Sequence, residues 1–357
     1  MKQSQKNYNR IVIKVGSSLL CSQELACESF ESSLVGIAAQ IAQLVESGRQ
    51  VVVVTSGAIA FGMRLLKMKS RPGDLSLLQA AAAVGQHLLM NEYRSCFEEK
   101  GLTSAQVLLT WDDFSDRKRY LNAKNTLLAL LRFKSIPVIN ENDTVSTDEI
   151  KFGDNDRLSS LVATLVSADL LLILSDIDGL LDKEKHVIRV VSEINSEVKS
   201  LACPTDKKTC VGGMVTKLEA AKIAVDSGIP CVIANGRHKN IILSVVNDPA
   251  SAGTLFIPKQ GSLAARERWL AFGAKPKARI IIDGGAKQAL LKGKSLLSVG
   301  VLGVEGNFES KDVVSIKDLQ RHEIARGKAN VSSKHLEKVL GVRSDKEVVH
   351  CDNIVIL

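Results

Sequence analysis

The chain has 357 residues, of which 45% are hydrophobic and 24% charged, and its 47 basic and 39 acidic residues give a formal net charge of +8. This length exceeds what one hydrophobic core usually supports, so we expect two folded domains, and the ordinary composition excludes extended disorder. The positive charge suits nucleic acid, anionic lipid or acidic and phosphorylated small molecules, and it does not choose among them.

The cysteines and the N-terminus indicate the compartment. Seven cysteines are scattered without a C-x-x-C pair, so neither a disulfide framework nor a zinc site is expected. The first ten residues are polar and basic, and Lys14 and Gly16 interrupt the apolar stretch that follows, which argues against a signal peptide. No apolar run reaches the length of a membrane span. We therefore expect a cytoplasmic protein without a membrane segment.

Short apolar runs rich in β-branched residues recur along the first two thirds of the chain, at residues 11–15, 51–54, 105–109, 136–139, 170–174 and 231–234. Segments of helical periodicity lie between them, at residues 31–46, 75–97, 119–133, 156–166 and 214–226. This alternation predicts an α/β fold, a three-layer sandwich with a mainly parallel sheet. Ligands of such folds bind at the carboxyl ends of the strands.

The pattern changes from about Gly253, where we place the linker. Short strand candidates then follow at residues 279–283, 299–304, 312–316 and 354–357, separated by glycines. These features favour a small β-rich second domain. We expect domains at residues 1–258 and 277–357.

Two strand ends carry small residues suited to an anion. The first ends in Lys14-Val15-Gly16-Ser17-Ser18, where glycine allows close backbone approach and N–H groups with a lysine neutralise a phosphate. Lys14 alone is weak support, since a lysine in a strand also extends simply to solvent. The second ends in Thr55-Ser56-Gly57 before a helix. Helix N-termini favour carboxylates or phosphates, although an ordinary N-cap explains Ser56 equally well.

The most polar segments flank the helix at 156–166. Asn140-Glu141-Asn142-Asp143 follow one strand, and Asp154-Asn155-Asp156 precede the helix. Asp143 is suited to accept from an ammonium group and Asn155 to donate to a carboxylate, as an amino-acid substrate requires. We expect Asp156 to hold one or two lysines rather than act as a base, because a carboxylate nucleophile is already ionised at neutral pH. A solvated loop with a capping side chain is the alternative.

The fifth strand ends in Ser175-Asp176, and a later loop, Val211-Gly212-Gly213-Met214-Val215-Thr216-Lys217, enters a helix. Two glycines, a hydroxyl and a lysine at a helix start again indicate phosphate binding. Phosphoryl transfer needs cations around the transferred group, and Lys14 with Lys217 would supply them.

Competing motifs fail. Gly293-Lys294-Ser295 resembles the end of a Walker A loop, but Gln288 occupies the position that requires glycine. No two histidines have metal-ligand spacing, and there is no G-x-S-x-G segment. Readings as a metal hydrolase or a serine hydrolase therefore rank low.

Taken together, the segments resemble the glutamate 5-kinase family of the amino-acid kinase superfamily, along the whole chain. The resemblance rests on residues 13–18, 54–59, 139–143, 152–156 and 212–217. It implies transfer of phosphate from ATP, with Mg²⁺, to the γ-carboxylate of glutamate, the first step of proline synthesis. It also implies feedback inhibition by proline, a dimer or tetramer, and a glutamyl phosphate reductase as a downstream partner.

The resemblance also implies residue roles. Lys14 and Lys217 would stabilise the phosphoryl group, with Asp156 organising them. Glutamate would be held by Ser56, Asp143, Asp154 and Asn155, and the nucleotide by Lys14, Ser175, Asp176, Val211, Gly212, Gly213, Met214, Val215, Thr216 and Lys217. Ser175 and Val211 stand where the family often has threonine. The change at Val211 puts only its side-chain contribution in doubt. No carboxylate cage is evident, so we expect no protein ligand for Mg²⁺, which nucleotide phosphates would hold.

From about Lys277 the chain is similar to a PUA domain, on residues 283–286 and 303–308. PUA domains of RNA-modifying enzymes bind RNA, but Phe308 is the only aromatic residue from 276 to 357, so a structural or regulatory role is favoured. Two alternatives are a kinase with another acceptor and an RNA-binding protein with a degenerate kinase domain. A kinase with another acceptor would need a different pocket in place of Asp143 and Asn155. A degenerate kinase domain would not need Lys14, Asp156 and Lys217, which are all present.

Overall fold

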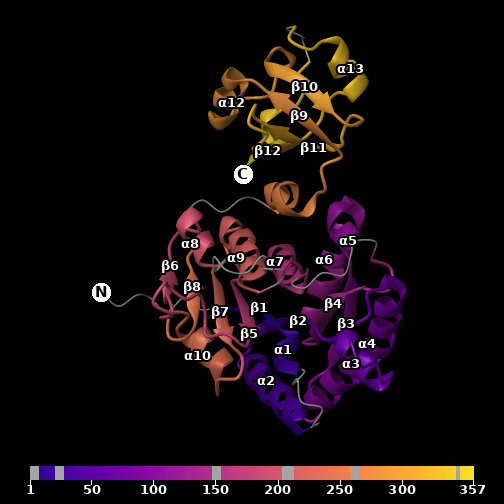
Figure 1. Ribbon diagram of the computed structural model, residues 1–357, viewed down its shortest axis with the longest axis vertical. Coiled ribbons are helices and arrows are strands. Elements are labelled where there is room, and N and C mark those ends of the chain that lie inside the picture. Colours follow the sequence, from indigo (N-terminus) through magenta and orange to yellow (C-terminus); the bar gives the residue numbers. More distant parts are fainter. Residues whose placement is uncertain (1–7, 21–27, 147–153, 203–212, 259–264, 343–345) are drawn as a thin grey trace. The chain divides into compact units, whose positions relative to one another are not determined.

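The computed structural model describes residues 8–20, 28–146, 154–202, 213–258, 265–342 and 346–357. The chain divides into two compact units, Met1–Asp113 with Lys118–Ser262, and Phe114–Arg117 with Leu263–Leu357 (Figure 1). Each unit is built around its own sheet. The domain limits 1–258 and 277–357 stay a prediction.

An eight-stranded, mainly parallel sheet with the order β3-β4-β2-β1-β5-β7-β8-β6 forms the centre of the first unit. Its strands are β1 (Arg10–Val15), β2 (Gln50–Thr55), β3 (Ser104–Leu109), β4 (Ile136–Glu141), β5 (Leu170–Ser175), β6 (Val190–Val191), β7 (Cys231–Asn235) and β8 (Thr254–Phe256). β8 pairs antiparallel with β7, whereas β1 pairs parallel with β2 and β5. The predicted α/β class and its mainly parallel sheet are confirmed.

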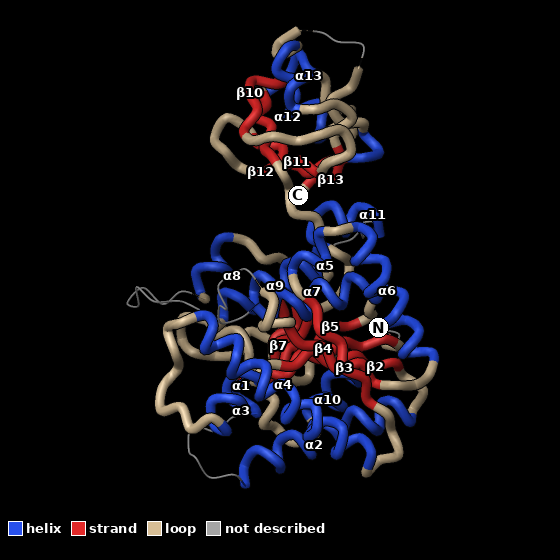
Figure 2. The backbone as a smooth tube through the Cα atoms, turned by 90° about the vertical axis from the view of Figure 1, so that its right-hand side faces the viewer, coloured by secondary structure: helices blue, strands red, loops and turns tan. Residues whose placement is uncertain are grey.

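Helices cover both faces of this sheet (Figures 1 and 2). One face carries α1 (Ser17–Leu20), α2 (Glu28–Glu46), α3 (Ala58–Leu65), α4 (Leu75–Glu98) and α10 (Ile241–Asn247). The other face carries α6 (Arg117–Arg132), α7 (Asp154–Val166) and α9 (Met214–Asp226). The shorter α5 (Trp111–Ser115) and α8 (Ser196–Leu201) complete the described helices of this part of the chain. The five predicted helices are present, with ends that differ by a few residues.

Alternation along β1 places Lys14 on the α7 side of the sheet. Ile11, Ile13 and Val15 belong to the core cluster that includes buried residues of α2 and α4. Successive side chains of a strand point to opposite faces, so Val12 and Lys14 face the other layer, where α7 packs on β1. The lysine therefore points into the helix layer that holds Asp156.

The linker begins later than the change of pattern at Gly253 suggested. Thr254 to Phe256 form β8, which remains part of the first sheet between β7 and β6. The strand was missed because only three residues pair, which is too short for a periodic signal. The two-residue β6 was missed for the same reason.

The second unit contains a five-stranded sheet with the order β10-β9-β11-β12-β13. Its elements are β9 (Ala278–Ile282), β10 (Val301–Glu305), β11 (Val313–Lys317), β12 (Glu323–Lys328), β13 (Ile354–Ile356), α11 (Ala265–Arg268), α12 (Gly284–Leu291) and α13 (Ser333–Lys338). Four of these strands match the predicted ones, and β12 was not expected. Throughout the described ranges, no helix is both long and apolar enough to cross a membrane.

Candidate active site

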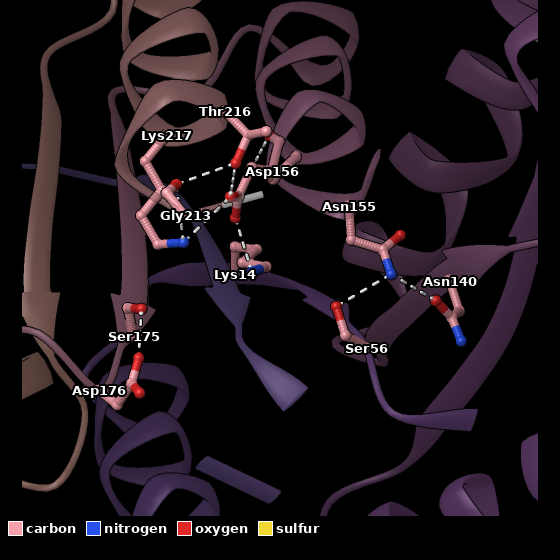
Figure 3. A network of polar contacts seen from close by, with 11 residues as sticks. Lys14, Ser56, Asn140, Asn155, Asp156, Ser175, Asp176, Gly213, Thr216 and Lys217 are labelled. Atoms are coloured by element: carbon pink, nitrogen blue, oxygen red, sulfur yellow. Dashed lines mark hydrogen bonds and ion pairs between the residues drawn. The ribbon is translucent and has the colours of Figure 1, made fainter. Parts of the chain in front are cut away.

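Three charged side chains meet near the carboxyl end of β1 and the first turns of α7 and α9 (Figure 3). Nζ of Lys14 on β1 lies 2.6 Å from Oδ1 of Asp156 on α7. Nζ of Lys217 on α9 lies 3.3 Å from Oδ2 of the same carboxylate. Thr216 adds a hydrogen bond from its hydroxyl to Oδ2, at 2.9 Å. One carboxylate thus contacts two ammonium groups, where the sequence analysis expected one or two.

The helix starts explain this meeting. Asp156 lies in the first turn of α7, where the helix dipole favours its negative charge. Lys217 lies in the first turn of α9, and its pair with Asp156 offsets the unfavourable dipole there. Gly213, which precedes α9, has a φ of 116°, a conformation that glycine adopts readily. Its carbonyl accepts from Nζ of Lys217 at 3.4 Å, which fixes the bend of the lysine chain.

The cluster is nearly dry and carries an excess positive charge. Lys14 is 5% exposed, Lys217 7% and Asp156 1%. Burial raises the pKa of Asp156, but the two lysines outweigh it and hold that pKa below its usual value. Burial, together with Lys217, lowers the pKa of Lys14 although Asp156 opposes this. Two cations facing one anion leave a net charge of about +1 that favours a bound anion.

The predicted nucleotide residues include Ser175 and Asp176 at the end of β5 and the first turn of α9. Ser175 is buried at the end of β5, and its hydroxyl donates to Oδ1 of Asp176 at 3.1 Å. Burial raises the pKa of Asp176, yet hydrogen bonds from its own backbone, Ser175 and Ser18 hold it below the usual value. Met214 and Val215 begin α9. Val211 and Gly212 lie outside the described residues.

Two residues predicted to bind glutamate, Ser56 and Asn155, belong to a set of hydrogen-bonded neutral side chains (Figure 3). Nδ2 of Asn155 donates to Oγ of Ser56 at 2.9 Å and to Oδ1 of Asn140 at 3.1 Å. Both hydrogens of the Asn155 amide are therefore in use, and its buried Oδ1 has no partner within the described part of the chain. Asp154 is the first residue of α7. Asp143 lies in the turn after β4.

Sequence reasoning missed two residues of this set. Asn140, near the end of β4, is 2% exposed, and its Nδ2 donates to Oε1 of Gln86 on α4 at 2.8 Å. Asn140 belonged to a polar segment in the sequence analysis, and its place directly after an apolar strand run was a usable signal. Gln86 gave only a faint one, as a lone amide in a run of small apolar residues.

Among the described residues of the charged cluster, the one carboxylate is already occupied by cations. Oδ1 of Asp156 is taken by Lys14, and Oδ2 by Lys217 and Thr216, so this carboxylate has little capacity left for a divalent ion. Among the described residues, the one group of three potential ligands close enough to share an ion is His350, Cys351 and Asp352, which belong to the second unit. A magnesium ion at the cluster would depend on ligands brought by the nucleotide.

A buried pair of lysines held by one aspartate, beside a set of hydrogen-bonded polar side chains at the carboxyl ends of parallel strands, fits a phosphotransferase that acts on small acids. The model of the amino acid kinase family matches residues 9–235, and that of the PUA domain matches residues 278–350. The chain belongs to the amino acid kinase family and, within it, to the glutamate 5-kinases, on the similarity of curated members along nearly its full length.

Curated relatives of that name cover nearly all or all of the chain. The glutamate 5-kinase of Thermoanaerobacter sp. (strain X514) is 45% identical over 368 aligned residues, which cover 98% of each chain. That of Marinomonas sp. (strain MWYL1) is 43% identical over 376, which cover 100% of each. Among solved structures, N-acetylglutamate synthase from Neisseria gonorrhoeae, complexed with coenzyme A and N-acetylglutamate, has a TM-score of 0.52 at 15% identity, covering 71% of this chain and 60% of that one. That likeness concerns the fold alone.

Proposed function

We propose that this protein transfers the γ-phosphoryl group of ATP to the γ-carboxylate of L-glutamate, forming L-glutamyl 5-phosphate and ADP. The observation that carries the proposal is the buried cluster of Lys14, Asp156 and Lys217, with its excess positive charge. The family membership supports glutamate as the acceptor.

In the proposed reaction, a γ-carboxylate oxygen attacks the γ-phosphorus, and the bond to the oxygen that bridges the β- and γ-phosphates breaks. That oxygen leaves with ADP. The nucleophile is already ionised at neutral pH, so no general base is needed. Lys14 and Lys217 offset the negative charge on the transferred group and the leaving oxygen. Asp156 positions both lysines, and its low pKa keeps it ionised while it does so.

The neutral side chains would select the substrate. Ser56 and Asn155 lie on the opposite side of the close-up from Ser175 and Asp176, with the charged cluster between the two pairs (Figure 3). Glutamate bound at Ser56 and Asn155 would thus reach the cluster from one side and ATP from the other. Asp143 and Asp154 would receive the ammonium group. The nucleotide would lie along Ser175, Asp176 and the loop Val211 to Lys217.

The test is to incubate the purified protein with ATP, Mg²⁺ and glutamate and to trap the acyl phosphate with hydroxylamine. We expect hydroxamate from glutamate and not from aspartate or N-acetylglutamate. Hydroxamate from another acid instead would support the same reaction with a different acceptor. No hydroxamate from any acid, in a folded protein that binds ATP, would contradict the proposal.

Further assignments rest on the resemblance and are part of this proposal. Mg²⁺ would enter with the nucleotide phosphates, proline would inhibit, and the protein would act in the cytoplasm as a dimer or tetramer that supplies a glutamyl phosphate reductase. For the C-terminal unit we favour a structural or regulatory role over RNA binding. Phe308, its only aromatic residue beyond residue 276, is 2% exposed in the core of that unit, so it offers no ring for stacking on a base.

A further inference from the structure

Helix α4 has two buried polar side chains that contact the ends of β2 and β4, next to the residues proposed to bind glutamate. Oε1 of Gln86 accepts from Asn140 at 2.8 Å, and the hydroxyl of Tyr93 lies 2.9 Å from Oγ1 of Thr55. Gln86 and Tyr93 are seven residues apart on one helix face. Both are buried, at 9% and 0% exposure. The helix thus contacts the ends of β4 and β2 through hydrogen bonds as well as apolar packing.

Two glycines fix this helix at its position. A Cβ at Gly85 would lie 1.7 Å from the carbonyl oxygen of Ala58, and one at Gly62 would lie 1.8 Å from that of Ala81. Only glycine allows the backbones of α3 and α4 to approach so closely. Gln86 follows Gly85 directly, and α3 begins two residues after Ser56. The helix contact therefore fixes the backbone of Gln86 relative to the turn that contains Ser56 and Gly57.

The hydrogen bonds of this set have a direction that the backbone imposes. The N–H of Glu141 can only donate, and it contacts one terminal atom of the Asn140 amide at 2.9 Å, which must be Oδ1. Nδ2 of Asn140 then faces Gln86, which must offer Oε1. Asn155 donates Nδ2 to the same Oδ1 and to Ser56. Ser56 accepts that bond, so its own hydroxyl hydrogen is available to a carboxylate.

We propose that Gln86 is a positioning residue of the glutamate site, and this inference rests on the proposed function. Its Oε1 accepts from Nδ2 of Asn140 and so holds the Asn140 amide in one orientation. Oδ1 of Asn140 then accepts from Asn155, which in turn donates to Ser56 and leaves the Ser56 hydroxyl hydrogen free for the substrate carboxylate. Gln86 keeps this orientation although its Nε2 is buried without a partner in the described ranges, an arrangement that costs free energy. Without Oε1, the Asn140 amide loses the contact that opposes its rotation.

The test uses Gln86→Met, which keeps the length of the side chain and removes the strong acceptor. Gln40→Met is the matched control, because Gln40 is equally buried on α2 and bonds backbone groups outside the site. We expect Gln86→Met to raise the KM for glutamate about tenfold, the effect of losing one oriented hydrogen bond. The KM for ATP and kcat should change less than about threefold. Gln40→Met should leave the KM for glutamate unchanged, and thermal unfolding reports any loss of stability in either variant.

A double-mutant cycle separates positioning from general destabilisation. If Gln86 acts through Asn140, Gln86→Met combined with Asn140→Ala will have the KM for glutamate of Asn140→Ala alone. Additive effects, an unchanged KM in Gln86→Met, or an equal rise in Gln40→Met would overturn the inference while the wild type remains active. A wild type that forms no hydroxamate from glutamate would overturn the proposed function and the inference together.

Discussion

The site combines two regions that work by different physics. The cluster of Lys14, Asp156 and Lys217 is charged and buried, and it acts through electrostatic attraction of the phosphoryl group. The set of Ser56, Asn155, Asn140 and Gln86 is neutral, and it acts through the direction of its hydrogen bonds. A field acts on any phosphoryl group, whereas directed hydrogen bonds distinguish one acid from another. Changes in the first region should therefore affect kcat, and changes in the second the KM for glutamate.

The largest expected effect is on catalysis. Lys217→Ala should lower kcat on the order of 1000-fold, because a cation aimed at the transferred group is lost from a dry site. The fold should survive, since Asp156 keeps its pair with Lys14. Lys222→Ala is the control, because Lys222 lies on the same helix and pairs with Asp226. Steady-state kinetics checks both, and a Lys217→Ala enzyme with normal turnover would refute the assigned role.

A second effect concerns stability. Asp156→Asn should lower the free energy of unfolding by about 3 kcal/mol, because it leaves two buried ammonium groups without their counter-charge. Glu98→Ala, in the exposed pair of Glu98 with Arg94 at 3.9 Å, should change it by less than about 1 kcal/mol. Urea denaturation measures both. Equal small losses in the two variants would contradict the burial of the charges of Lys14, Asp156 and Lys217.

A third effect sharpens the difference between the regions. Asp143→Ala should raise the KM for glutamate about tenfold, by loss of one charge-assisted hydrogen bond to the ammonium group. Its kcat and its KM for ATP should stay close to the wild type. If kcat fell instead and the KM for glutamate stayed constant, Asp143 would belong to the catalytic region.

The smallest effect is a displaced pH profile. Burial and Lys217 lower the pKa of Lys14 from the ordinary 10.5, so the native enzyme loses this charge at a pH below that of a free lysine. Activity should then fall on the alkaline side with an apparent pKa below 10.5. In Lys14→Arg, whose guanidinium stays protonated, the part of the decline due to Lys14 should disappear. A fall due to the substrate amino group would persist in both enzymes.

The sequence predicted the long apolar strands well and the short or charged strands poorly. β1 and β5 are buried on both faces, so their apolar runs are continuous and easy to recognise. β12 reads Glu-Ile-Ala-Arg-Gly-Lys, with three charged residues and a glycine, and carries no such signal. Its strand character comes from pairing with β11 and β13, which is a tertiary effect.

The same distinction applies to the site. Lys14 and Lys217 could be predicted because each stands in a local motif beside glycine. Gln86 could not be predicted, since it reaches Asn140, which is 54 positions away, only through the packing of α3 on α4. The orientation of the Asn155 amide depends on that packing too. Sequence reasoning expected Asn155 to donate to a carboxylate, whereas in the structure its amide hydrogens already serve Ser56 and Asn140.

The central claim is that a glutamate carboxylate oxygen attacks the γ-phosphorus of ATP beside the paired lysines. Glutamate labelled with ¹⁸O in its γ-carboxylate tests it directly. Hydroxylamine attacks the acyl carbon of the product, so the released phosphate keeps the oxygen that bridged carbon and phosphorus. The account predicts phosphate with one ¹⁸O atom by mass spectrometry, formed on the order of 1000-fold more slowly by Lys217→Ala. Phosphate without ¹⁸O from the wild-type enzyme would show that the carboxylate is not the nucleophile.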